Sequence, residues 1–167
     1  MSAAVPVLEH YRSMVGGLAD ARVDTGELRA LSEADLLEVN QLHTAGARVW
    51  GSAGAAIAGE LAYRSRPELG GEGLARRTGH RTVENLLQTT TGATREQVVT
   101  VVAAGTLLVE LADEGMVDTV TGGVSVVSQP WLRPVAVAVA AGSVSVSASQ
   151  SIARGLGVPN SAVTAEQ

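Results

Sequence analysis

The sequence predicts an all-α protein, an irregular multi-helix bundle with one long helix. Apolar residues recur at steps of three and four along most of the chain, which is the spacing of one helix face. Polar caps and glycine stops bracket these periodic stretches. A chain of 167 residues has the length of one ordinary domain. We therefore predict a single helical domain over residues 1–167.

The first helix is expected over residues 7–21, with apolar residues at positions 7, 8, 11, 14, 15 and 18. Gly16 and Gly17 weaken its second half by about 1 kcal/mol each relative to alanine. A turn is expected around Asp24, Thr25 and Gly26.

The longest helix is predicted over about residues 33–66. Ser32 and Asp35 have capping-box spacing, and Pro67 disfavours a helical conformation at the residue before it. The middle segment, GSAGAAIAG, has side chains small enough to admit another helix, and its glycines allow a kink. The stripe expected to face the core consists of Leu36, Val39, His43, Ala47, Trp50, Ile57 and Leu61.

Shorter elements follow a connector at residues 67–73. A short helix over 73–80 stops at Gly79, and a second over 83–90 is capped by Thr82 and closed by Gly92. Thr94 and Gln97 form a second capping box for a helix over 95–114. The run VVTVV suits a strand nearly as well, but the cap and the length favour the helix.

The end of the chain is less regular. Residues 116–129 form either an irregular loop or at most a minor β-hairpin near 117–128. A helical pair is expected over 131–141 and 144–156, divided at Gly142–Ser143 and terminated by Gly155 and Gly157.

The composition excludes several classes of chemistry. The chain has no cysteine, which rules out disulfides, thiol nucleophiles and thiolate metal sites. All twelve basic residues are arginine, so lysine-based chemistry is absent. The three histidines, His10, His43 and His80, lie too far apart for a metal motif. His43 is expected in the core, and His80 as an exposed polar residue or a phosphate contact. We predict no catalytic centre, no metal and no cofactor.

No segment predicts membrane insertion or export. The most apolar stretch, residues 134–141, is far shorter than the roughly 20 residues that span a bilayer. The N-terminus lacks a basic start followed by an apolar core. We therefore expect a soluble, cytoplasmic protein without a membrane partner.

Half of the basic charge lies in residues 64–96. There six arginines face four acids, whereas the whole chain has a net charge of −5. Such an island is either a phosphate-binding footprint or a solvated face cross-linked by its own acids. Charge alone favours the second interpretation, because duplex binders usually have a larger basic excess. The candidate DNA-binding residues are Arg64, Arg66, Arg76, Arg77, Arg81 and Arg95.

The segment GLARRTGHRTVENLL has features of a helix-turn-helix. Ala75 and Gly79 are four apart, so a small residue would allow close helix crossing and a glycine the turn. Arg81, Thr82, Glu84 and Asn85 would then begin a helix that presents side chains to base edges. A plain helical hairpin buried in the bundle explains the same pattern and is favoured.

Two blocks of sequence resemble a known family. Residues 31–98, from LSEADLLEVNQL to TTTGATREQV, are similar to the N-terminal domain of bacterial HNH endonuclease family proteins, a domain of unknown function of the 13E12-repeat type. Residues 130–159 resemble the later block of that domain, with a Pro-Trp, an Ala-Ala-Gly turn, a serine-initiated helix and a Gly-Leu-Gly stop. The family-like part covers about residues 30–164 in the same order.

In that family the domain precedes a His-Asn-His nuclease module that cuts DNA. The resemblance implies a DNA-associated role, in which this domain helps a nuclease to bind or assemble on its substrate. Nothing in the chain matches the nuclease motif, so that module is expected to be absent and no catalytic residue is carried over. The chain is then a piece of a longer protein or a natural short version. The serine-rich VSVSASQS and the glycines of the long helix depart from the family pattern.

The sequence is therefore compatible with three functions. The first is a non-catalytic DNA-binding accessory domain, whose partners are DNA and the missing nuclease module. The second is a protein–protein or dimerisation module that uses the Gly/Ala-rich centre of the long helix and the valine-rich residues 134–141; packing of these faces within the chain competes with it. The third, catalysis by this chain alone, has no candidate centre.

Overall fold

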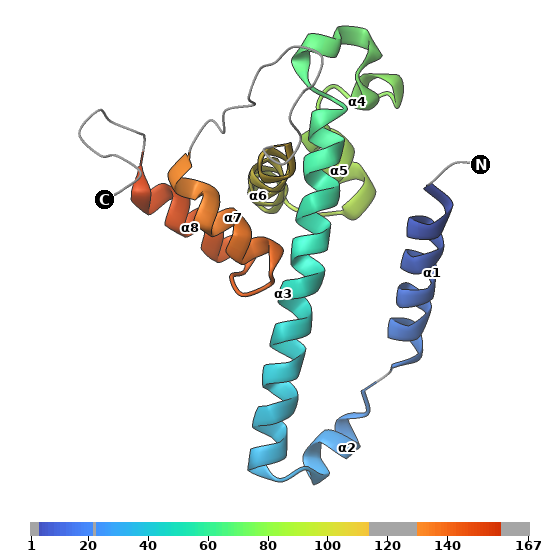
Figure 1. Cartoon of the computed structure of the whole chain (residues 1–167). Coiled ribbons are helices and arrows are strands. Elements are labelled where there is room, and N and C mark those ends of the chain that lie inside the picture. The colour runs from blue at the N-terminus through green and yellow to red at the C-terminus, as the bar shows by residue number, and fades with distance from the viewer. Residues whose placement is uncertain (1–3, 22, 114–129, 158–167) are drawn as a thin grey trace. The chain divides into compact units, whose positions relative to one another are not determined.

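The protein is described here by a computed structural model that covers residues 4–21, 23–113 and 130–157 (Figure 1). Over these residues it contains eight α-helices, two 3-10 segments and no strand, which confirms the all-α prediction. The predicted hairpin near 117–128 lies outside the described residues. The elements are α1 (Ala4–Asp20), α2 (Thr25–Ala30), α3 (Glu33–Tyr63), η1 (Pro67–Glu72), α4 (Leu74–Arg77), α5 (Val83–Thr91), α6 (Arg95–Asp113), η2 (Pro130–Leu132), α7 (Arg133–Ala140) and α8 (Val146–Leu156).

The chain divides into two compact units, an N-terminal unit of residues 1–42 and a C-terminal unit of residues 43–167. The division falls within α3. The expected single domain over residues 1–167 stays a prediction. No helix in the described part of the chain is both long and apolar enough to cross a membrane.

The N-terminal unit contains α1, α2 and the start of α3. The expected turn at Asp24 is in fact the start of α2, because the Asp24 carboxylate accepts a hydrogen bond from the Gly26 amide at 2.8 Å. The predicted cap of α3 is confirmed: Ser32 Oγ accepts from the Asp35 amide at 3.2 Å and donates to the Asp35 carboxylate at 2.7 Å.

The described side chains of the N-terminal unit are not buried. Between residues 6 and 42 all are exposed except Tyr11, Met14 and Leu28, which are half-buried. Ten large aliphatic side chains are between 38% and 69% exposed: Val7, Leu8, Val15, Leu18, Val23, Leu31, Leu36, Leu37, Val39 and Leu42. The described side chains of this unit thus form no buried core.

The prediction of which face of α3 is buried is wrong. Six of the seven residues expected to face the core are exposed, His43 among them, and Leu61 is half-buried. The buried residues of α3 are instead Ser52, Ala55, Ala58 and Gly59, which lie on a different face. Hydropathy favoured the large side chains, whereas packing selected the face that another backbone can approach.

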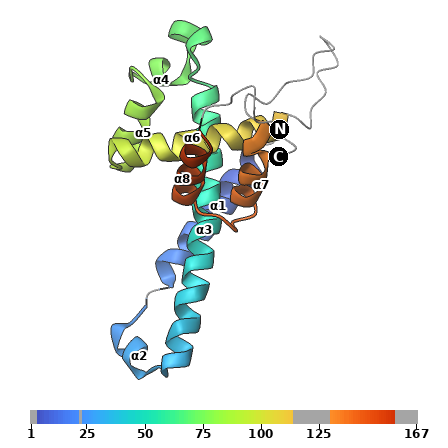
Figure 2. The ribbon, with the colours of Figure 1, turned by 90° about the vertical axis from the view of Figure 1, so that its left-hand side faces the viewer.

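Gly59 and Gly105 explain why this face is buried. A Cβ atom on Gly59 would overlap the Gly105 carbonyl, and a Cβ on Gly105 would overlap the Ala55 carbonyl. The two helices therefore touch backbone to backbone, which only glycine permits. Figure 2 shows α6 running across α3 rather than along it. The predicted close approach at the small-residue segment thus occurs within the chain.

The core of the C-terminal unit joins α3, α5 and α6. Ala58, Leu87 and Val98 form its buried centre. Half-buried apolar residues pack around them: Leu61, Val83, Ala93, Val101 and Val102. The Thr94–Gln97 capping box is confirmed, since the Thr94 amide donates to Gln97 Oε1 at 2.9 Å and the Gln97 amide to Thr94 Oγ1 at 3.3 Å. The segment with VVTVV is accordingly a helix.

The helical pair α7–α8 packs against α6. Gly142, at φ 68°, makes the predicted break between the two helices. Arg48 of α3 ties this turn to the rest of the unit, because its Nε donates to the Gly142 carbonyl at 3.0 Å. Ala136 and Val139 are buried, so part of the valine-rich segment is also used within the chain. Gly155 lies inside α8, and Gly157 alone ends it.

Candidate nucleic-acid interface

The arginine-rich segment begins where α3 ends. The predicted stop at Pro67 is confirmed, with α3 ending at Tyr63. Two hydrogen bonds then tie α4 back to this end: the Leu74 amide donates to the Arg64 carbonyl at 2.8 Å, and the Ala75 amide donates to Ser65 Oγ at 3.1 Å. The connector therefore folds back, and α4 is held beside the last turn of α3.

A glycine turn joins α4 to α5. Gly79 has φ 83°, and the His80 amide donates to the Ala75 carbonyl at 2.7 Å, which closes α4 in a Schellman arrangement. Thr82 then caps α5 by accepting from the Asn85 amide at 3.3 Å, as predicted. This geometry places Arg81 directly before the N-terminus of α5.

The structure agrees with the helical-hairpin interpretation of this segment. The first helix was expected over 73–80 but α4 is a single turn of four residues. Leu86 and Leu87 bury one face of α5 in the core. Asn85, expected to face bases, has its side-chain Oδ1 3.3 Å from Thr82 Oγ1 at the cap.

Three of the six candidate arginines line one hollow of about 990 Å³. Arg66 follows α3, Arg76 lies on α4, and Arg81 precedes α5. Val83, Val102 and Val109 contribute apolar wall, and two acids, Glu84 and Glu110, also line it. The hollow therefore combines an apolar wall with a small excess of positive charge.

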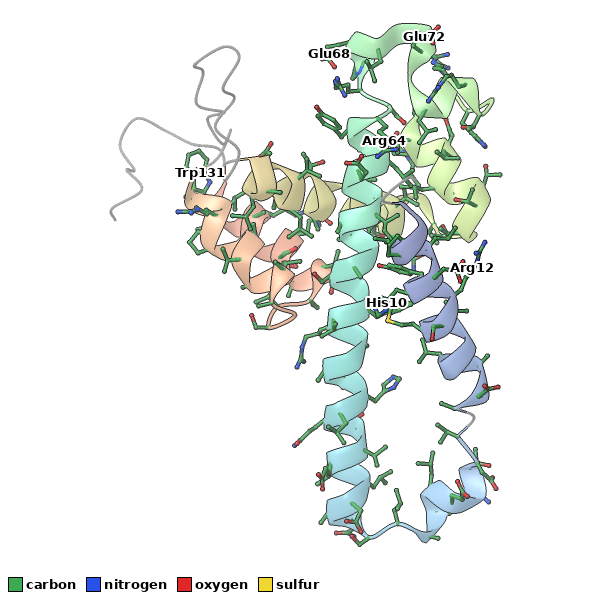
Figure 3. All side chains as sticks on the ribbon, turned by 45° about the vertical axis from the view of Figure 1, so that its right-hand side comes forward. His10, Arg12, Arg64, Glu68, Glu72 and Trp131 are labelled. Atoms are coloured by element: carbon green, nitrogen blue, oxygen red, sulfur yellow. The ribbon has the colours of Figure 1, made fainter. Side chains whose placement is uncertain are left out.

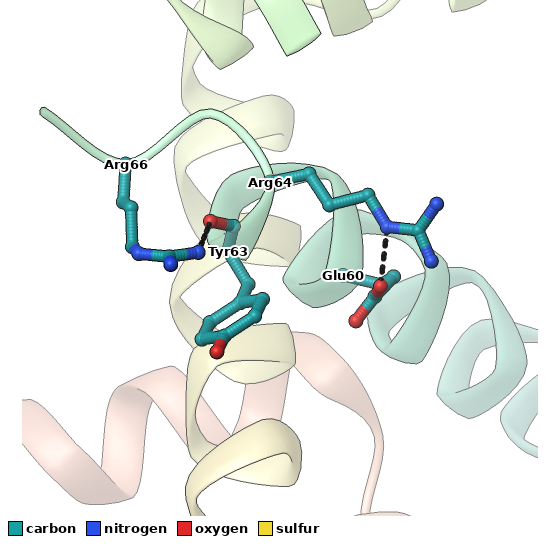
Figure 4. Close-up of polar contacts among 4 residues, drawn as sticks. All are labelled: Glu60, Tyr63, Arg64 and Arg66. Carbon is teal, nitrogen blue, oxygen red and sulfur yellow. Dashed lines mark hydrogen bonds and ion pairs between the residues drawn. The ribbon is translucent and has the colours of Figure 1, made fainter. Parts of the chain in front are cut away.

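Arg64 and Arg66 are held by residues of α3 (Figure 4). Arg64 Nε donates to the Glu60 carboxylate, and this ion pair spans one helical turn. Arg66 Nη1 donates to the Tyr63 carbonyl at 2.8 Å, and its guanidinium lies 4.3 Å from the centroid of the Tyr63 ring. These contacts position Arg66 at the hollow and engage Arg64 elsewhere.

The other four arginines are exposed. The guanidinium groups of Arg76, Arg77, Arg81 and Arg95 form no hydrogen bond or ion pair with any residue that the structure describes. Arg64, Arg77 and Arg95 are not brought into the hollow.

The four acids of the island do not cross-link it. Within the described ranges, Glu68, Glu72, Glu84 and Glu96 form no ion pair with an arginine. Figure 3 shows Glu68 and Glu72 on η1, and neither lines the hollow. The ion pairs that would make residues 64–96 a self-neutralised face are therefore not found among these residues.

Sequence reasoning missed two residues of the site. Tyr63 precedes Arg66 by three positions, a spacing at which an aromatic ring and a guanidinium meet at a helix end. Glu110 is the single charged residue in an otherwise uncharged run of α6 from 97 to 112. A lone charge in such a run indicates that its surroundings differ from those of its neighbours. Glu110 is half-buried and lines the hollow.

The described residues contain no group of three or more metal-binding side chains. His43 and His10 are exposed, and His80 is half-buried at the turn between α4 and α5. No protein-family model, no curated protein and no solved structure matches the chain.

Proposed function

We propose that the chain is a DNA-associated accessory module that contacts duplex phosphates through its arginine-rich helical segment. Its resemblance to the N-terminal domain of HNH endonuclease family proteins supplies the context, beside a nuclease module. In this role the chain itself is not catalytic.

One observation carries the proposal. Arginines from three separate segments, Arg66, Arg76 and Arg81, converge on one hollow, and the guanidinium groups of Arg76 and Arg81 form no hydrogen bond or ion pair with a described residue. Guanidinium groups donate several hydrogen bonds in a planar fork that matches phosphate oxygens. Contacts to phosphates position a protein on a duplex without reading its sequence, which agrees with the contact of the Asn85 side chain with the Thr82 hydroxyl at the start of α5.

The number of available arginines gives a quantitative expectation. If Arg76, Arg77, Arg81 and Arg95 each neutralise one phosphate, the logarithm of the binding constant falls with the logarithm of salt concentration at a slope of about −3.6. Arg64 and Arg66 are left out of this count, because Glu60 engages Arg64 and the carbonyl and ring of Tyr63 engage Arg66.

The test is duplex-DNA binding at about 50 and 200 mM salt. The variant Arg76→Ala/Arg77→Ala/Arg81→Ala removes three of the four contacts, so we expect a slope of about −0.9 and much weaker binding at low salt. The control Arg12→Ala/Arg29→Ala/Arg154→Ala makes the same change in net charge at exposed positions outside the segment. It should bind like the unmodified protein.

A folded protein that does not bind the duplex at low salt would contradict the proposal. Equal losses in the two triple variants would do the same, since they would reduce the interaction to net charge. Either result would favour the alternative, a helical protein–protein module without direct DNA contact.

A further inference from the structure

The hollow that the three arginines line also has a wall that contacts to phosphates do not use. Val102, Thr106 and Val109 follow one another on α6 at steps of four and three residues, so they lie on one face of that helix. The volume of about 990 Å³ is at the upper end of the range for small-molecule sites, about 300–1,000 Å³. Such a wall can cover the uncharged part of a ligand.

Tyr63 adds a flat surface to the hollow. It lines the hollow and is 48% exposed, and the Arg66 guanidinium lies 4.3 Å from the centroid of its ring (Figure 4). Nucleic-acid bases stack on aromatic rings, and one stacked base tightens binding by about 5- to 150-fold. A single ring offers a place for one base.

Glu84 restricts the ligands that fit. It is half-buried in the first turn of α5, three residues after Arg81, and it lines the hollow together with the half-buried Glu110. A carboxylate accepts hydrogen bonds and does not donate them, so it disfavours a ligand that is anionic throughout. The ligand that suits the hollow therefore combines an anionic group, a flat apolar body and a hydrogen-bond donor.

We propose that the hollow binds one unpaired nucleotide, with its phosphate on Arg76 and Arg81 and its base against Tyr63 and the α6 wall. Resting on the proposed function, this assignment names the form of DNA that the same arginines take up. In an intact duplex each base is stacked and paired, so neither its flat face nor its pairing edge can reach the hollow. An extrahelical nucleotide exposes both and keeps its phosphates beside the arginines.

The carboxylate of Glu84 also predicts a preference among bases. Cytosine, adenine and guanine each carry an exocyclic amino group that donates to a carboxylate, whereas thymine carries carbonyl oxygens instead. An unpaired deoxycytidine should therefore bind more tightly than an unpaired thymidine. Phosphate contacts alone give no such preference, because they do not read the base.

The test compares three duplexes of the same sequence at one salt concentration: fully paired, with one bulged deoxycytidine, and with one bulged thymidine. The ratios of their affinities remove the phosphate contacts that all three share. We expect the deoxycytidine bulge to bind about 10-fold more tightly than the paired duplex. It should bind at least about 5-fold more tightly than the thymidine bulge.

A first variant fills the hollow. Thr106→Trp places an indole against the apolar wall and should equalise the affinities for the bulged and paired duplexes. The matched control is Thr89→Trp, at an exposed threonine of α5 that does not line the hollow. Both threonines donate to the carbonyl four residues before them, at 3.0 Å and 2.8 Å. The control should keep the preference for the bulge.

A second variant tests the choice of base. Glu84→Gln replaces an acceptor by an amide that also donates, so the preference for deoxycytidine over thymidine should fall at least about 5-fold. Glu96→Gln removes the same charge from the first turn of α6, outside the hollow. It should keep the preference.

Free nucleotides separate the two sources of such a ligand. Binding of dCMP and TMP is measured by titration up to about 10 mM, which detects weak complexes. Tighter binding of dCMP than of TMP by a chain that binds no duplex would support the nucleotide site and contradict the proposed function.

Two results would overturn the assignment. The first is equal affinity for the bulged and paired duplexes together with no binding of dCMP, which leaves the duplex phosphate contacts of the proposed function intact. The second is an equal loss of bulge preference in Thr106→Trp and Thr89→Trp, since the preference would then arise outside the hollow.

Discussion

The two units use apolar residues in opposite ways. The C-terminal unit buries small residues, such as Ala55, Ala58 and Gly59, at a crossing of two helices. The N-terminal unit carries larger aliphatic residues and leaves them exposed. Apolar content alone therefore does not predict a core. The decisive property is whether a face finds a second surface that can approach it.

The largest difference between the two units is expected when one leucine in each unit is replaced by alanine. Leu87→Ala removes a buried side chain from the core of the C-terminal unit and should lower the free energy of unfolding by about 3 kcal/mol. Leu18→Ala removes a side chain that is 61% exposed and should cost less than about 0.5 kcal/mol in the dilute protein. Chemical denaturation measures the free energy of unfolding of both variants. Equal losses would contradict the contrast between buried apolar residues in the C-terminal unit and exposed ones in the N-terminal unit.

A second pair of substitutions tests the crossing itself. Gly59→Ala forces a Cβ into the Gly105 backbone and should destabilise the protein by about 2 kcal/mol. Gly54→Ala, five residues earlier in the same helix, meets no atom within 4 Å and should stabilise it by up to about 1 kcal/mol. Thermal unfolding of the two variants should shift in opposite directions.

The third prediction concerns the turn before α5. Thr82→Ala removes the cap that Thr82 Oγ1 provides to the Asn85 amide, at a cost of about 1 kcal/mol. Thr82→Ser keeps the cap and serves as the control. Hydrogen exchange of the first α5 amides should accelerate in the alanine variant alone.

The smallest expected effect on stability comes from the ion pair at the end of α3. Glu60→Gln should cost less than about 0.5 kcal/mol, because the pair is largely exposed. The same change releases Arg64, so the salt dependence of DNA binding should steepen by about 0.9 in slope. The control Glu38→Gln, in the N-terminal unit, removes the same charge and should leave the slope unchanged.

The features that the sequence predicted well are local. The caps at Ser32, Thr82 and Thr94 and the stop at Gly92 depend on residues within four positions of one another. Because these hydrogen bonds join residues that are close together in the chain, the sequence alone indicates where a helix starts or ends.

The features that sequence reasoning missed depend on contacts between distant segments. The buried face of α3 follows from Gly105 on α6, which hydropathy periodicity does not encode. Each arginine of the site was visible in the sequence. Their meeting in one hollow depends on the bond from the Leu74 amide to the Arg64 carbonyl and on the turn at Gly79.

The glycine contact between α3 and α6 also determines the composition of the hollow. With no side chain between the backbones, α6 cannot rotate about its axis without forcing Ala104 or Thr106 into the contact. The contact at Gly105 thereby fixes the rotation of α6 about its axis. In this orientation α6 lines the hollow with Val102, Thr106, Val109 and Glu110. Because neither glycine has a side chain, their contact fixes the rotation of α6. It thereby determines which α6 side chains line the hollow together with the arginines.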